Sequence, residues 1–222
     1  FTTNGSSFTI MADPYLGLRP TVSPPAGSTA AFRIANASVN VYGIYVLSNQ
    51  SVPYGVWASS SYVNISSVVV STAGGLGIYT AGVRISSWSA ISYSSVSVGI
   101  AYGIWLDGST MTVVSYSSAS ATRNALYLSG GSSNTIQNVT LSQNPYVYGS
   151  YAIMLSTSHY NRIDLTSATA YGGMYLAGSS SNSITNSVLR GNGLPATIAM
   201  NSSGILFYNS SYNSIDLSTA TG

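Results

Sequence analysis

Short runs of alternating hydrophobic and polar residues recur along the chain, each beginning with a small residue. In eight places an alanine or glycine is followed, one and three positions later, by residues that are almost all apolar. Alternation of this kind predicts a short strand with one buried face. The starts are separated by 24, 22, 26, 22, 27, 21 and 31 residues, so one unit repeats with insertions. The eight starting residues are Ala31, Gly55, Gly77, Gly103, Ala125, Ala152, Gly173 and Gly204.

An asparagine marks a second fixed position in most of these units. It lies nine residues after the small residue in six of the eight units, at Asn40, Asn64, Asn134, Asn161, Asn182 and Asn213. Asparagine suits a sharp corner because it tolerates the left-handed backbone conformation. Stacked asparagine amides can also form a hydrogen-bonded ladder. We therefore expect this column to be structural.

The constant offset between the two positions favours a solenoid in which each unit is one coil. The alternative is a sandwich of two sheets, but its strands would not need to repeat the same offset. The chain would then consist of a lead-in or capping segment, residues 1–30, and a solenoid domain of about eight coils, residues 31–222.

Three units show the repeat most clearly, at residues 126–144, 174–192 and 206–222. Their order of alternating apolar residues, a Ser/Gly turn and an asparagine resembles the coils of the right-handed parallel β-helix family of pectin-lyase-like and NosD-like proteins. The resemblance covers about residues 31–222 and implies an all-β, right-handed parallel β-helix, in keeping with right-handed crossovers. NosD-like relatives are linked to copper handling, but this chain matches only their coil scaffold, so no cofactor is expected.

The alternation also predicts which side chains face outward. Residues one and three positions after the small residue should fill the lumen, and the residue between them should lie on the outer surface. A contiguous aromatic surface of this kind tends to mark an interaction site. Three interpretations remain open: rings that stack as scaffold, packing against another subunit, and a platform for sugar rings. The outward aromatic residues are Trp57, Tyr79, Trp105, Tyr127 and Tyr175.

The composition excludes several classes of protein. Only 5% of residues are charged and neither lysine nor glutamate occurs, so charged surface helices are not expected. A net charge of +2 spread over six scattered arginines does not make a nucleic-acid-binding surface. No apolar run reaches the roughly 18–20 residues of a membrane-spanning helix. The absence of cysteine excludes disulfides and thiolate metal sites.

The few titratable residues do not predict a catalytic group. Asp164 and Asp216 each lie three residues after the asparagine of their coil, with the coil of Thr185 between them, so they should be about 9.6 Å apart. That separation is at the far end of the range for inverting glycosidases, and Arg162 beside Asp164 favours a surface ion pair. His159 is the only histidine and has no second metal ligand nearby. We therefore expect no catalysis and no metal site.

Asn-x-Ser/Thr sequons are mildly more frequent than chance would give. Glycans would keep a chain with so few charges solvated, which favours secretion to an extracellular or cell-surface location. The cell surface of an archaeon or another prokaryote is our preferred assignment. The seven candidate glycosylation sites are Asn4, Asn36, Asn49, Asn64, Asn138, Asn201 and Asn209.

The ends and inserts of the solenoid suggest contacts with other molecules. Exposed strand edges at the ends of a solenoid invite pairing with another chain, and Tyr146 and Tyr148 in the insert at residues 144–151 are candidate contact residues. We predict a non-catalytic secreted structural protein that self-associates into a cell-surface filament, layer or adhesin. The alternative is a glycan-binding or glycan-cleaving β-helix, similar to a polysaccharide lyase or hydrolase or to a tailspike, that uses the aromatic surface.

Overall fold

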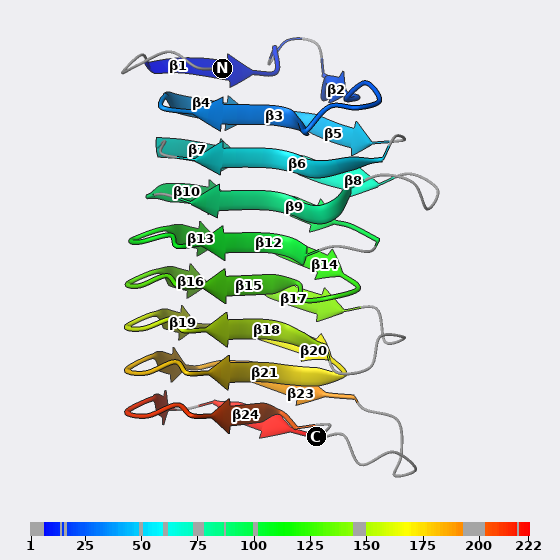
Figure 1. The fold of residues 1–222 in the computed structure, drawn as a ribbon. Helices are drawn as coiled ribbons and strands as arrows, with labels where there is room; N and C mark the ends of the chain where they lie inside the picture. Colours follow the sequence, from blue (N-terminus) through cyan, green and yellow to red (C-terminus); the bar gives the residue numbers. More distant parts are fainter. Residues whose placement is uncertain are drawn as a thin grey trace.

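The chain winds into a stack of coils, each made of three short strands (Figure 1). This computed structural model describes residues 7–13, 15, 17–48, 51–59, 62–72, 78–86, 88–99, 102–143, 150–192, 203–216 and 218–222, without the side chains of Phe8 and Tyr79. Each described strand from β1 to β23 pairs in parallel with the strand three places further along the chain. The predicted parallel solenoid is therefore confirmed, and the two-sheet sandwich is excluded.

Equivalent strands of successive coils form three parallel sheets, A, B and C. Sheet A contains β1 (Ser7–Met11), β4 (Ser38–Tyr42), β7 (Tyr62–Ser66), β10 (Ser89–Ser92), β13 (Val113–Ser115), β16 (Thr135–Gln137), β19 (Arg162–Asp164), β22 (Ser183–Thr185) and β25 (Ser214–Asp216). Sheet B contains β2 (Thr21–Val22), β5 (Tyr45–Ser48), β8 (Val69–Thr72), β11 (Ser95–Ser97), β14 (Ser118–Ala121), β17 (Thr140–Gln143), β20 (Ser167–Ala170), β23 (Val188–Gly191) and β26 (Thr219–Thr221). Sheet C contains β3 (Ala30–Ala35), β6 (Val52–Ser59), β9 (Ile78–Ser86), β12 (Tyr102–Asp107), β15 (Leu126–Ser129), β18 (Tyr151–Ser156), β21 (Gly172–Ala177) and β24 (Ile205–Tyr208).

Eight coils, from β3–β5 to β24–β26, each contribute one strand to every sheet, as the sequence predicted. The lead-in segment adds a partial turn before them. Its strand β1 pairs with β4, and its strand β2 pairs with β5, so sheets A and B begin one strand earlier than sheet C. The described part of residues 1–30 thus continues two of the three sheets of the solenoid.

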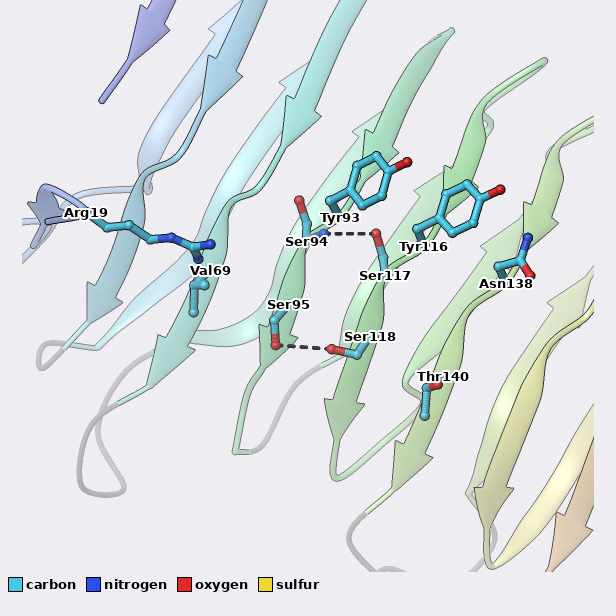
Figure 2. A pocket seen from close by; sticks show the side chains of 10 residues that line it. All are labelled: Arg19, Val69, Tyr93, Ser94, Ser95, Tyr116, Ser117, Ser118, Asn138 and Thr140. Carbon is cyan, nitrogen blue, oxygen red and sulfur yellow. Dashed lines mark hydrogen bonds between the residues drawn. The ribbon is translucent and has the colours of Figure 1, made fainter. Parts of the chain in front are cut away.

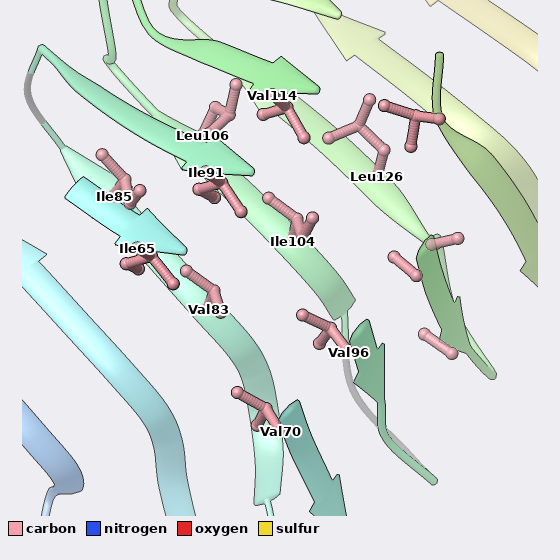
Figure 3. Packing of buried hydrophobic residues seen from close by; sticks show 14 of the residues in the cluster. Ile65, Val70, Val83, Ile85, Ile91, Val96, Ile104, Leu106, Val114 and Leu126 are labelled. Atoms are coloured by element: carbon pink, nitrogen blue, oxygen red, sulfur yellow. The ribbon is translucent and has the colours of Figure 1, made fainter. Parts of the chain in front are cut away.

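Apolar side chains from all three sheets fill the lumen (Figure 3). In sheet C the residues Val83, Ile104 and Leu126 are aligned in register on β9, β12 and β15, and each is at most 1% exposed. Each such side chain contributes about 1.5–3 kcal/mol by leaving water. Ile104, Leu126 and Ile153 are buried as predicted, whereas Ile205 in the last coil is only partly buried against the core.

Where a unit begins with glycine, close packing at a bend leaves no room for a Cβ atom. A Cβ atom on Gly103 would lie 2.4 Å from the carbonyl oxygen of Ala125, and one on Gly173 would lie 2.4 Å from that of Gly204. The third coil was assigned the wrong small residue from the sequence. Gly77 is outside the described residues, and the position belongs to Gly82, whose Cβ would meet the Gly103 carbonyl oxygen at 2.9 Å.

This shift of five residues changes the outward column of sheet C. Arg84 pairs with Trp57 on one side and with Trp105 on the other, so it occupies the place that was predicted for Tyr79. The register of the β6–β9 pair shifts between Val52 and Tyr54, which accommodates the one extra residue of the longer strand β9. The prediction that Tyr79 belongs to the outward column is therefore wrong.

The predicted asparagine ladder is present in the later coils. Asn134, Asn161, Asn182 and Asn213 stack so that the backbone N–H and the side-chain amide of each donate to the Oδ1 of the next. Asn40 and Asn64 pair with each other one position further along sheet A, outside the ladder. At the corner, the residue with a left-handed backbone is the one before the asparagine, such as Ser133 with φ 57°, and not the asparagine itself.

Candidate functional site

The outer surface of sheet C carries a continuous group of aromatic rings, which we call the aromatic strip. One column consists of the predicted outward positions. A second column lies on the same strands, nearer to the N-terminal end of each strand. The first column contains Trp57, Trp105, Tyr127 and Tyr175, with Arg84 between the two tryptophans and Met154 between the two tyrosines. The second column supplies Tyr54, Tyr102 and Tyr151.

The rings of the strip pack against one another within and between coils. Tyr102 stacks on Tyr127 with 4.8 Å between ring centroids, and Trp105 stacks on Tyr127 at 5.8 Å. Tyr151 stacks on Tyr175 at 5.0 Å. These contacts leave the rings half-buried, so part of each ring remains accessible on the outer surface. The interpretation of the rings as scaffold and their interpretation as a binding surface are therefore compatible.

An arginine and an aspartate lie in the middle of the strip. Arg84 donates from Nε to Asp107 Oδ2 at 3.1 Å, also contacts that oxygen through Nη2, and donates from Nη1 to the Tyr54 hydroxyl at 2.9 Å. Its guanidinium lies 4.5 Å from the ring centroid of Trp105. Ser129 donates its hydroxyl to Asp107 Oδ1 at 3.0 Å and accepts a hydrogen bond from Trp105 Nε1 at 2.8 Å.

These contacts shift the ionisation of the groups in the strip. Burial lowers the pKa of Arg84, but its hydrogen bond to Asp107 and the nearby Tyr54 outweigh this and raise it, so the guanidinium stays charged. Burial, together with Tyr102, raises the pKa of the Tyr127 hydroxyl. Burial and the neighbouring tyrosines likewise raise the pKa of Tyr151. At physiological pH the strip therefore offers the neutral phenols of Tyr127 and Tyr151 and the charged guanidinium of Arg84.

A second polar surface lies at the corner between sheets A and B (Figure 2). It is a shallow groove of about 610 Å³. Tyr93 and Tyr116 stand side by side along it, 5.2 Å apart and nearly parallel, and both are exposed. Ser95 and Ser118, joined by a hydrogen bond of 3.2 Å, line its floor. Its remaining lining residues are Arg19, Val69, Ser94, Ser117, Asn138 and Thr140.

The acidic pair singled out from the sequence does not form a site. Asp164 and Asp216 lie in the same register on sheet A, with Thr185 between them. Asp164 binds Arg162 at 3.1 Å, and it accepts hydrogen bonds from Thr185 and Asn186. The predicted surface ion pair is present: Oδ2 of this carboxylate pairs with Arg162 of the same strand, and Oδ1 bonds to the following coil.

His159 is half-buried in the turn between β18 and β19. Its Nδ1 accepts a hydrogen bond from the backbone N–H of Ser180 at 3.1 Å and lies 2.9 Å from the Ser180 hydroxyl. Across the described ranges, no three His, Asp or Glu side chains gather closely enough to hold a metal ion. Nor does any helix within those ranges have the length and hydrophobicity to cross a membrane.

The candidate glycosylation sites are in different environments. Asn36 and Asn209 are exposed, Asn138 is half-buried at the edge of the groove, and the amide of Asn64 donates to the Tyr42 hydroxyl at 2.8 Å. The predicted sites Asn4, Asn49 and Asn201 lie outside the described residues, as do the predicted contact residues Tyr146 and Tyr148.

Several residues of the strip were missed at the level of sequence. Arg84 could have been found, because Gly82 is followed by Val83 and Ile85 in the same pattern as the other units. Asp107 lies two residues after Trp105, so alternation places it on the same outer surface. Tyr54, Tyr102 and Tyr151 precede the bend of their coils, where the simple alternation no longer applies.

Comparisons with known proteins agree with this architecture. The model of the family described as "right handed beta helix region" matches residues 81–222. No protein with a curated description matches the chain. The enzymatically active domain of tailspike protein 2 from bacteriophage CBA120 superposes with a TM-score of 0.67 at 13% identity, covering 88% of this chain and 35% of the tailspike chain.

Two further tailspikes share the fold. The full-length tailspike protein 2 of the Escherichia coli O157:H7 bacteriophage gives a TM-score of 0.59 at 14% identity, covering 88% of this chain and 31% of its own. The Dettilon tailspike protein gives 0.53 at 16% identity, covering 98% and 40%. This chain thus spans about a third of the length of the tailspikes that it resembles, and the likeness is one of fold.

The comparison corrects one expectation. The absence of catalysis, predicted from the few scattered carboxylates, is wrong as a conclusion, because a structure with the same fold over most of this chain is an enzymatically active domain. The parallel strands, the filled lumen and the match over residues 81–222 lead to one assignment. The chain belongs to the right-handed β-helix family.

Proposed function

We propose that this chain is a glycan-binding β-helix module and that the aromatic strip is its binding surface. The observation that carries the proposal is the row of half-buried rings on sheet C, with Arg84 and Asp107 in its middle. Aromatic rings stack on the C–H faces of sugars, while the charged pair and Ser129 can bind their hydroxyl groups. Similarity to tailspikes, one of them an enzymatically active domain, supports a β-helix of this kind more than it supports a filament or an adhesin.

Binding can be tested with the tryptophans of the chain. Trp57 and Trp105 lie in the strip, whereas Trp88 lies by sheet A, next to Tyr62. In a Trp88→Phe background, the fluorescence of the remaining tryptophans reports directly on the strip. We expect a change on titration with at least one polysaccharide from a panel of bacterial surface polysaccharides.

Substitution then tests whether the rings are the contact. The double variant Trp105→Ala/Tyr127→Ala should lose about tenfold or more in affinity, because each stacking ring contributes on the order of 1 kcal/mol. The matched control is Tyr93→Ala/Tyr116→Ala, which removes the stacked pair of the groove and should leave affinity unchanged. Thermal unfolding of both variants checks that the coils are intact. Equal affinities for the wild type and the strip variant would refute the proposal.

Cleavage of the bound glycan is the second candidate, because Asp107 places a carboxylate in the middle of the strip. The other aspartates follow β1 or lie in β19 and β25 of sheet A, away from this surface. A mechanism with two carboxylates would therefore need an acid from a second chain. In a reducing-end assay at saturating concentrations of a polysaccharide that binds, where a loss of affinity no longer limits the rate, Asp107→Asn should abolish product formation. If the wild type releases no product, cleavage is discarded and binding stands.

A further inference from the structure

The corner between sheets A and B places a residue with left-handed backbone directly after each of several sheet A strands. Its backbone N–H donates to the carbonyl of the last residue of the sheet A strand in the next coil. Glycine and asparagine tolerate this conformation, whereas a bulky residue in it is strained. The position is filled, with φ between 46° and 67°, by Gly43, Asn138 and Asn186 but also by Tyr93 and Tyr116. The geometry of the corner does not explain these two tyrosines.

The two tyrosines and Asn138 form a row along the groove (Figure 2). Tyr93 and Tyr116 are 63% and 52% exposed, and their rings lie 5.2 Å apart and nearly parallel. Asn138 takes the same position in the next coil, about one strand spacing of 4.8 Å beyond Tyr116. A ring attached to the Asn138 amide would therefore continue the stack and cover the exposed ring of Tyr116.

Asn138 also begins the sequon Asn138-Val139-Thr140, and both of its polar side chains line the groove. Within the described ranges, neither the Asn138 amide nor the Thr140 hydroxyl takes part in a hydrogen bond. The sequon of Asn64 is different, because its amide donates to the Tyr42 hydroxyl and its Ser66 hydroxyl accepts from Ser92. The acceptor groups at Asn138 are thus available to a modifying enzyme, whereas those at Asn64 are not.

We infer that Asn138 carries an N-linked glycan whose first sugar packs on Tyr116. The donor is a sugar bound through phosphate to a lipid, and a transferase joins it to the asparagine. The bond from C1 of the sugar to the phosphate oxygen breaks, C1 bonds to Nδ2 of Asn138, Nδ2 loses one proton, and the lipid phosphate leaves. The C–H face of the sugar then covers the Tyr116 ring. This site lies away from the aromatic strip and does not depend on the proposed function.

The arginines of the chain isolate this site for mass spectrometry. Trypsin cleaves the lysine-free chain only after arginine, so residues 124–162 form one peptide in which Asn138 is the only sequon. In protein purified from its source organism, we expect most copies of this peptide to be heavier by whole sugar residues, with fragmentation placing the sugar on Asn138. A peptide of bare mass, or one with sugar only on serine or threonine, would overturn the inference.

Substitution of Thr140 removes the sequon without changing the corner residue. Thr140→Ala, produced in the source organism, should lower the glycosylated fraction of Asn138 at least tenfold, and Thr140→Ser should retain it. Asn138→Gln is less suitable, because it also places a less tolerant residue in the left-handed conformation. An unchanged glycosylated fraction in Thr140→Ala would mean that the modification does not use this sequon.

Thermal unfolding tests the contact with Tyr116. Tyr116→Ala should lower the melting temperature by about 2–4 °C more in the glycosylated protein than in the Thr140→Ala background, because only the former loses a packed sugar. The matched control is Leu165→Ala. Leu165 is also 52% exposed and left-handed, and it follows Asn138 on the side away from the groove. Its effect should be the same in both backgrounds. Equal effects of Tyr116→Ala in both would show that the sugar does not pack on this ring.

Discussion

Individual polar side chains in this solenoid are fixed mainly by the coils above and below them. Asp164 is an example: it takes hydrogen bonds from Thr185 and Asn186 of the following coil and an ion pair from Arg162 of its own strand. Because these donors favour the ionised form, chiefly Asn186 and Thr185, they lower the pKa of Asp164 below the ordinary value of 3.8. Folding is thereby linked to pH through this carboxylate.

A group whose pKa is lower in the folded than in the unfolded state stabilises the fold above the unfolded value, and loses this effect as pH falls through the folded value. Asp164→Asn should therefore destabilise the protein at pH 7, and the difference from wild type should shrink below about pH 3.8. Urea unfolding at neutral and acid pH measures it. Arg162→Gln should keep most of the pH dependence. A difference that is constant with pH would contradict the assignment.

The asparagine ladder is the second feature that depends on individual side chains. Asn134 and Asn161 are at most 1% exposed, and Asn161 Oδ1 accepts from both the backbone N–H and the amide of Asn134. The spacing of nine residues identified the four ladder asparagines, but it also included Asn40 and Asn64. Those two differ because the apolar residue follows them directly, which moves their side chains to the other face of the strand.

Asn161→Ala should cost about 3 kcal/mol, because it leaves buried donors and acceptors of the neighbouring coils without partners. Asn40→Ala is the matched control, since its amide makes only a 3.3 Å contact with the Thr9 hydroxyl and is half-exposed. It should cost less than about 1 kcal/mol. Chemical denaturation gives both values. Similar costs for the two variants would mean that the ladder does not stabilise the fold.

At the scale of the strand, the small residue before each bend decides the register. The position holds glycine in five coils, where no Cβ atom would fit, and alanine in the other three, and the sequence identifies it correctly in seven of the eight coils. The third coil was misread because Gly77 and Gly82 both precede an apolar residue. Local spacing cannot choose between them. The choice depends on pairing with Trp57 and Trp105 in adjacent coils.

Gly103→Ala tests this packing. Its Cβ would meet the Ala125 carbonyl oxygen at 2.4 Å, so a backbone atom must move, and we expect a loss of about 3 kcal/mol in stability. Gly130→Ala serves as the control, because Gly130 has φ 63° and nothing within 4 Å of its Cβ position. The left-handed backbone alone should cost about 1 kcal/mol there. If Gly130→Ala proves the more damaging in thermal unfolding, close packing is not what selects the small residue.

For the whole molecule, the fold class and the number of coils could be predicted because they depend on a repeated local pattern. The binding surface could be predicted only in part. Trp57, Trp105, Tyr127 and Tyr175 follow the repeat, but Arg84 depends on the correct register of the third coil. The pairing of Arg84 with Asp107 could not be predicted from the sequence either, since these residues meet only when successive coils stack.

Stacking also makes stability depend on position along the axis. Each coil contacts only its neighbours, so the total is close to a sum of coil and interface contributions. Leu126, in the middle, is fully buried, whereas Phe207 and Ile215 in the last coil are 41% and 45% exposed. Leu126→Ala should therefore cost about 3 kcal/mol and Phe207→Ala less than about 1 kcal/mol.

Amide hydrogen exchange of the 222-residue chain should follow the same order. Strands β24, β25 and β26 each have a partner on one side only, in β21, β22 and β23, so their coil can open without breaking the core of its neighbours. We expect its amides to exchange well before those of β15–β17, which have partners on both sides. Uniform protection in dilute solution would contradict this account. Protection of the last coil that grows with protein concentration would mean that a second copy covers it, as expected if solenoid ends pair.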